Sequence, residues 1–75
     1  MVKTFTFVNA ESGKARDVYA GLKKINAEVH PLFGEFDFLV IADSVDLRES
    51  AAKVLDRIQK VKGVAKTRTL IGAEL

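Results

Sequence analysis

The spacing of hydrophobic residues changes along the chain, and the order of these changes predicts the fold. Residues 2–9 alternate, with Phe5 and Phe7 on one side and threonines on the other, which is typical of a β-strand. Residues 11–25 change to helical spacing. The apolar stripe of this expected helix consists of Ala15, Val18, Tyr19, Leu22 and Ile25.

The middle of the chain predicts two further strands. Residues 27–33 form the first, and Pro31 places it at a sheet edge or at a bulge because proline donates no ladder hydrogen bond. Residues 34–35, Gly-Glu, are expected to turn the chain. Residues 36–42, FDFLVIA, form the most apolar strand.

The last part of the chain predicts a helix followed by a strand. Asp46 and Glu49 have the spacing of a capping box at the start of a helix over residues 44–63, and Gly63 is a natural stop. Residues 64–72 are the last strand. The apolar face of this helix consists of Leu47, Ala51, Val54, Leu55 and Ile58.

The resulting order is βαββαβ, which is the ferredoxin-like arrangement of the α+β class. We expect one domain over residues 1–75, with both helices on one face of a four-stranded antiparallel sheet.

Composition narrows the possible sites and partners. The chain has no cysteine and one histidine, so disulfides, thiolate metal sites and histidine-rich metal sites are excluded, and no cofactor is expected. A net charge of +2 from well-mixed charges is weak evidence for nucleic acid. No apolar run is long enough to span a membrane and no signal peptide is evident, so we expect a cytoplasmic protein.

The third strand has more apolar surface than two helices can cover. Phe36, Phe38, Val40 and Ala42 are predicted on one face, and Leu39 and Ile41 on the other. An exposed face of this kind is rare in monomers, and a small domain gains stability from a partner subunit. We therefore expect a homodimer that packs sheet against sheet. The expected interface residues are Phe38, Leu39, Val40 and Ile41.

Two segments carry a resemblance to a known family. FGEFDFLVIA, residues 33–42, resembles the Gly-Glu-Phe/Tyr-Asp-apolar signature of the ligand-sensing (RAM) domain of the Lrp/AsnC, or feast/famine, transcription regulators. IQKVKGVAKTRTLI, residues 58–71, is similar to that domain's last helix and strand. Because this chain begins at the first strand, it resembles a stand-alone version without the helix-turn-helix domain.

The resemblance implies a dimer that assembles further, often into an octameric ring, and that binds amino acids between dimers. It also implies cooperation with full-length regulators, without direct nucleic-acid binding. The ligand site it implies consists of Phe33, Gly34, Glu35, Phe36, Asp37, Thr67 and Thr69.

The chemistry of these residues suits an amino acid. Asp37 or Glu35 can pair with the ammonium group, and backbone N–H groups at Gly34 can approach the carboxylate. Thr67, Thr69 and Arg68 supply further donors, while Phe33 and Phe36 can enclose the apolar part of the ligand.

Each residue also has a structural interpretation. Gly34 suits a hairpin position with positive φ, Asp37 suits hydrogen bonds that hold a turn, and threonines suit any strand.

Two other functions remain possible from the sequence. Small dimeric α+β barrels of similar topology include isomerases and cofactor-free monooxygenases, for which His30 and Asp37 are the candidate catalytic groups. RNA-binding domains share βαββαβ, but the acidic pair Glu35 and Asp37 stands where their basic and aromatic signature would be. We therefore expect a binding module rather than an enzyme.

Overall fold

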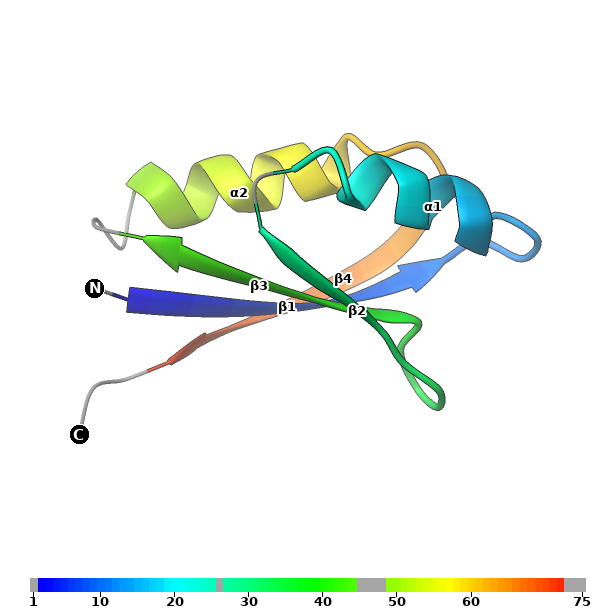
Figure 1. Cartoon of the computed structure of the whole chain (residues 1–75), viewed down its shortest axis with the longest axis horizontal. Coiled ribbons are helices and arrows are strands. Elements are labelled where there is room, and N and C mark those ends of the chain that lie inside the picture. Colours follow the sequence, from blue (N-terminus) through cyan, green and yellow to red (C-terminus); the bar gives the residue numbers. More distant parts are fainter. Residues whose placement is uncertain (1, 26, 45–48, 73–75) are drawn as a thin grey trace.

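A computed structural model describes residues 2–25, 27–44 and 49–72. The elements follow the expected order: β1 (Val2–Ala10), α1 (Ala15–Leu22), β2 (Glu28–Pro31), β3 (Phe38–Ser44), α2 (Glu49–Gln59) and β4 (Val64–Gly72). The strands form one antiparallel sheet in the order β2-β3-β1-β4, and both helices lie on the same side of it (Figure 1). The ferredoxin-like prediction is confirmed.

The helices are shorter than their patterns predict. α1 ends at Leu22, three residues before Ile25, and α2 ends at Gln59. The turn after α2 is closed by Gly63, whose φ of +97° is a conformation that favours glycine. The expected capping pair cannot be assessed, because Asp46 lies outside the described residues, as does Leu47.

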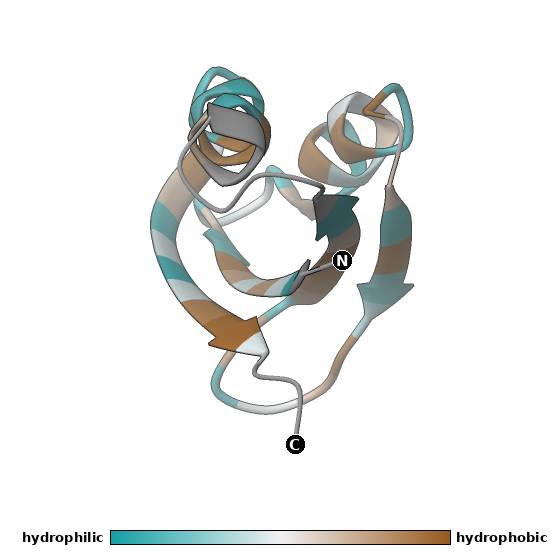
Figure 2. Ribbon diagram, turned by 90° about the vertical axis from the view of Figure 1, so that its left-hand side faces the viewer, coloured by the Kyte–Doolittle hydropathy of each residue, from teal (hydrophilic) through white to brown (hydrophobic). Residues whose placement is uncertain are grey.

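The two apolar helix stripes meet over the sheet to form the core. Brown, hydrophobic positions of both helices turn towards the sheet, which curves around them (Figure 2). Val18 and Leu22 of α1 and Ile58 of α2 are completely buried, as is Val8 of β1. Ala15, expected on the buried stripe, is exposed because it opens the first turn of α1.

β2 occupies an edge of the sheet, as Pro31 predicts. Its four residues pair with Phe38 to Ile41 of β3, and Pro31 is the last residue of the strand. β3 continues to Ser44, three residues beyond the end of this pairing. The two strands are therefore unequal in length, and within the described residues no strand pairs with β3 on the β2 side at residues 42–44.

Candidate functional site

The face of the sheet opposite the helices carries a stripe of apolar side chains. Strand alternation places odd-numbered residues of β1 and β3 on this open face, and the pairing register sets them side by side. Phe5 lies opposite both Ile41 and Leu70, and Phe7 lies opposite Leu39. Leu70 is 49% exposed, and the others are half-buried. The stripe consists of Phe5, Phe7, Leu39, Ile41 and Leu70.

The structure corrects half of the expected dimer interface. Phe38 is 5% exposed and Val40 is 1% exposed, because both point towards the helices and belong to the core of the chain itself. They are not available to a second subunit. Leu39 and Ile41 point to the open face, so the interface expectation now rests on the stripe rather than on four consecutive residues.

The predicted ligand segment forms the hairpin between β2 and β3. The hairpin is closed by the N–H of Leu32, which donates to the carbonyl of Asp37 at 2.8 Å. Gly34 has a φ of +125°, so the structural interpretation of this glycine applies. Phe33 is fully exposed at the tip, beside an exposed Glu35.

Asp37 fastens this hairpin to the end of β1. Its carboxylate Oδ2 accepts a hydrogen bond from the N–H of Ala10 at 2.8 Å, and its own N–H donates to the carbonyl of Val8 at 3.0 Å. The carboxylate therefore has a structural partner where the apolar strand begins. An acidic residue between two phenylalanines is explained by this contact.

Phe36 is on the opposite face from the one its spacing predicts. Its ring lies 5.1 Å, centroid to centroid, from that of Phe7 on the open face, whereas Phe38 is buried beneath the helices. β3 begins only at Phe38, so the bend at Asp37 interrupts the alternation. Arg68 of β4 lies opposite Phe7 of β1, on the same open face. Phe36, Phe7 and Arg68 thus form a row across the open face.

The two predicted threonines are not part of this arrangement. Thr67 lies opposite Val8 and Thr69 opposite Thr6, so both point to the helix side of the sheet. The hydroxyl of Thr69 hydrogen-bonds that of Thr6 at 3.1 Å, and Thr6 is 1% exposed. The structure therefore does not bring the threonines together with the hairpin, and their positions favour the structural interpretation.

This assignment predicts energetic coupling between the threonine pair. Thr6→Val and Thr69→Val should each destabilise the protein by about 1 kcal/mol, because each leaves the other hydroxyl without its partner. The double variant should lose about 0.5–1.5 kcal/mol less than the sum. Urea unfolding of the four proteins measures this difference, and Thr4→Val with Thr69→Val is the additive control, since Thr4 bonds to the carbonyl of Ala42 instead. Strict additivity of the first pair would contradict the assignment.

The two candidate catalytic groups, His30 and Asp37, each contact a different partner. His30 Nε2 lies 3.4 Å from Glu28 Oε2 on the open-face side of β2, and both side chains are more than half exposed. The carboxylate of Asp37 is bound to the Ala10 amide instead. Within the described part of the chain, no group of three or more His, Asp or Glu side chains is placed to hold a metal ion.

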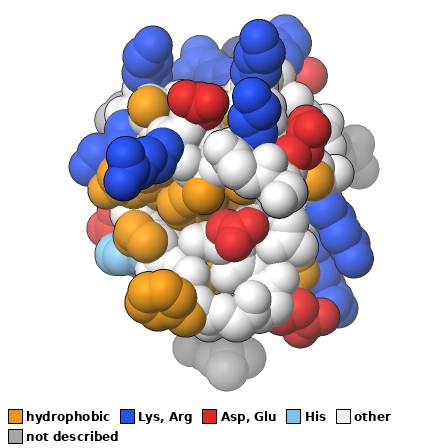
Figure 3. Space-filling model, turned by 90° about the vertical axis from the view of Figure 1, so that its right-hand side faces the viewer, with side chains coloured by type: hydrophobic (Ala, Val, Ile, Leu, Met, Phe, Trp, Pro, Cys, Tyr) orange, Lys and Arg blue, Asp and Glu red, His pale blue; other side chains and the backbone are white. Residues whose placement is uncertain are grey.

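Charge is distributed unequally between the two layers. Apart from Glu49, whose side chain is outside the described part of the chain, the helices and their flanking turns expose eight basic side chains against three acidic ones, Glu11, Asp17 and Asp56. The basic residues are Lys14, Arg16, Lys23, Lys24, Lys53, Arg57, Lys60 and Lys62. Blue side chains accordingly gather over the helices at the top of Figure 3, which views the hairpin end of the molecule.

The chain is similar to known proteins in its three-dimensional structure. The chain matches no protein-family model and no curated protein sequence. It is similar to the crystal structure of FFRP-DM1, with 25% identity and a TM-score of 0.84 over 97% of this chain and 100% of that one. It is also similar to a Neisseria meningitidis transcriptional regulator in complex with L-Met, with 25% identity and a TM-score of 0.80 over 97% of this chain.

The chain has a fold of the Lrp/AsnC type. Escherichia coli AsnC has the same fold, with a TM-score of 0.84 over 99% of this chain at 16% identity. The Lrp/AsnC-type domain described here spans 52% of the AsnC chain and 50% of the Neisseria chain. None of the described helices is both long enough and apolar enough to cross a membrane.

Proposed function

We propose that this Lrp/AsnC-type domain is an amino-acid-binding module that self-associates through its sheet and takes part in regulation. The observation that carries the proposal is its likeness, over nearly the whole chain, to a transcriptional regulator crystallised with L-Met. The same likeness favours a binding module over the alternative of a small barrel enzyme.

The apolar stripe supports self-association. A second copy packed on it would remove Phe5, Phe7, Leu39, Ile41 and Leu70 from water, and each Å² of apolar surface so buried contributes about 25 cal/mol. The dimer would then assemble further, into a ring such as an octamer. It would act on, or assemble with, a full-length regulator of the same type rather than on nucleic acid directly.

The hairpin supports amino-acid binding at the junction between dimers. Phe33 offers an exposed apolar wall and Gly34 an accessible backbone, because a Cβ added there would meet nothing within 4 Å. Glu35 and Asp37 supply negative charge for an ammonium group, and Phe36 and Arg68 lie on the adjoining open face. We leave Thr67 and Thr69 out of this site because they point to the helices.

Thermal melting against the twenty amino acids tests the proposal. A ligand present at 100 times its dissociation constant adds about 2.7 kcal/mol, and each kcal/mol raises the Tm of a small domain by about 4–8 °C. We expect a rise with one or a few amino acids. Asp37→Asn should reduce this rise, since it removes the charge but keeps an oxygen that can accept from the Ala10 amide.

Asp17→Asn, an equal change of charge on the exposed side of α1, is the control and should leave the ligand response unchanged. No rise in Tm with any amino acid would remove the ligand-binding part of the proposal, while leaving the fold and the dimer standing.

A further inference from the structure

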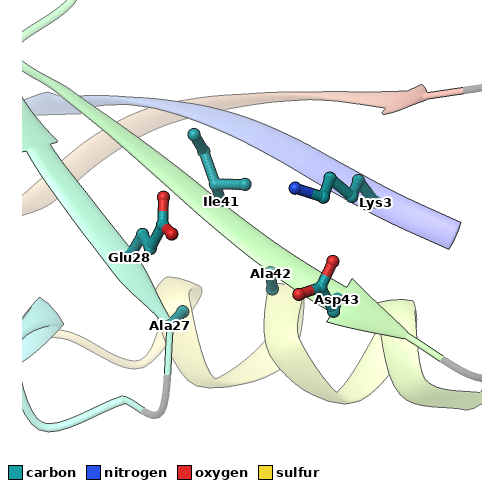
Figure 4. Close-up of a pocket in the computed structure, with 6 residues that line it drawn as sticks. All are labelled: Lys3, Ala27, Glu28, Ile41, Ala42 and Asp43. Carbon is teal, nitrogen blue, oxygen red and sulfur yellow. The ribbon is translucent and has the colours of Figure 1, made fainter. Parts of the chain in front are cut away.

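The sheet side of the molecule is the side that the proposed dimer covers. A hollow of about 440 Å³ lies there, where β3 extends beyond β2 (Figure 4). Glu28 and Ile41 in its lining lie opposite each other on the open face, and the amino group of Lys3 points towards Ile41. A second copy packed on the open face would cover these residues. The helical layer is the surface that such a dimer leaves exposed.

Basic residues of the helical layer form a stripe along α2. Lys53, Arg57 and Lys60 recur at the i, i+4, i+7 spacing that places side chains on one side of a helix. Lys60 continues the last helical turn, because its N–H donates to the carbonyl of Asp56 at 3.1 Å. With a rise of about 1.5 Å per residue, the stripe is about 10 Å long.

Two close contacts join the end of this stripe to α1. Val61, the second residue beyond α2, packs against Gly21, where an added Cβ would lie 2.6 Å from the Cγ1 of Val61. A Cβ added at Gly63 would lie 2.9 Å from the Cβ of Lys14. Lys14 and Lys62 therefore lie beside the end of α2. They extend the stripe towards the hairpin end of the molecule, where lysine and arginine side chains gather over the helices (Figure 3).

Few of these cations are neutralised within the chain. Among the described side chains, the helical layer holds one ion pair, between Lys60 and Asp56 at 3.1 Å. Lys14, Arg57 and Lys62 are exposed and have no carboxylate partner among the same side chains. Like charges held close together repel each other, and carboxylates brought by a partner would relieve this repulsion.

We propose that this basic surface, composed of Lys14, Lys53, Arg57, Lys60 and Lys62, binds an extended acidic segment of a partner protein. Alternate residues of an extended chain are about 7 Å apart, which is close to the separation of about 6 Å between residues four apart in a helix. Carboxylates at alternate positions can therefore meet successive cations of the stripe. This surface is independent of the hairpin, and in the proposed dimer its two copies face outwards.

The composition of the layer favours a polypeptide over a nucleic acid. Asp17 and Asp56 are interspersed among the basic residues and would repel a continuous row of phosphates, whereas a polypeptide can place its carboxylates singly. The two helices contain a single aromatic residue, Tyr19, on which a base could stack. Its ring is stacked on that of Phe38 instead, and the amino group of Lys23 lies 5.4 Å from its centroid.

Fluorescence anisotropy with a labelled peptide of six Glu-Ala repeats tests this inference. We expect saturable binding with a Kd of about 10–100 μM at about 50 mM salt, because exposed ion pairs are individually weak but act together here. Binding should weaken at least about tenfold at about 300 mM salt, since the ions screen such pairs. A peptide of six Gln-Ala repeats, which lacks the carboxylates, should not bind.

A pair of charge reversals locates the surface. Arg57→Glu should weaken binding of the Glu-Ala peptide by about three- to tenfold, since it removes one ion pair and adds a like charge. Lys3→Glu makes the same change of charge at an exposed position on the sheet side, and should change the affinity less than about twofold. In NMR spectra of the ¹⁵N-labelled protein, the amides that shift with the peptide should belong to residues 14–24 and 53–62.

Four results would overturn the inference. They are no saturable binding of the Glu-Ala peptide, equal binding of the Gln-Ala peptide, and equal losses of affinity in Arg57→Glu and Lys3→Glu. The fourth is tighter binding of a single-stranded oligonucleotide of the same length, which would assign the surface to phosphates. None of these results depends on the amino-acid response at the hairpin, which thermal melting measures separately.

Discussion

Leu39→Glu is expected to convert the proposed sheet-to-sheet dimer into monomers. Leu39 lies between Phe7 and His30 on the open face, inside the proposed interface and away from the lining of the hollow. By symmetry, a dimer of this variant would bury two new carboxylates. Leaving a buried charge unpaired costs about 3–5 kcal/mol, so the dimer should weaken by more than about a hundredfold. Light scattering after size-exclusion chromatography measures the mass of the particle.

A control must add the same charge elsewhere. Ala20 is exposed on α1, on the opposite side of the molecule from the stripe, and Ala20→Glu should leave the mass unchanged. If Leu39→Glu retained the mass of the parent protein while remaining folded by circular dichroism, the open face would not be the dimer interface.

Ile58→Ala is expected to bring the protein close to unfolding. Ile58 is completely buried where α2 packs on the sheet, and removal of such a side chain costs about 2–5 kcal/mol through lost burial and the cavity that remains. A domain of this size has only a few kcal/mol of net stability to lose. Urea unfolding at a fixed protein concentration gives the change.

Ile71→Ala removes the same atoms from a position that is 54% exposed, and should cost well under half as much. Equal losses of unfolding free energy in the two variants would show that Ile58 is not buried in the core.

The sequence predicted the order of the elements because each had a clear signal of its own. The alternation in β1, the helical stripe from Ala15 to Ile25 and the position of Pro31 are local features, and local features are what periodicity detects. The Gly-Glu-Phe-Asp segment, taken together with the last helix and strand, also indicated the Lrp/AsnC type, although no family model matches the chain.

The candidate site was harder to predict because it depends on features that are not local. The directions of Thr67 and Thr69 follow from their register against β1, and pattern alone does not give a register. Phe36 changes face because Asp37 bonds to Ala10, a contact across 27 residues. The hollow lies where β3 extends beyond β2, and nothing in the local pattern singles out its lining residues Lys3, Glu28 and Asp43.

The separation of charge between the layers determines the directions in which a larger particle can grow. In a dimer closed through the sheets, the helices form both outer surfaces, and each carries the excess of lysine and arginine described above. Two such surfaces repel each other, which disfavours stacking of these dimers helix on helix. A larger particle built from such dimers would grow sideways instead, through the hairpins and the strand edges, where Phe33 is fully exposed. A head-to-tail lateral contact of this kind closes into a ring when the rotation between neighbours allows it, and otherwise extends into an open filament.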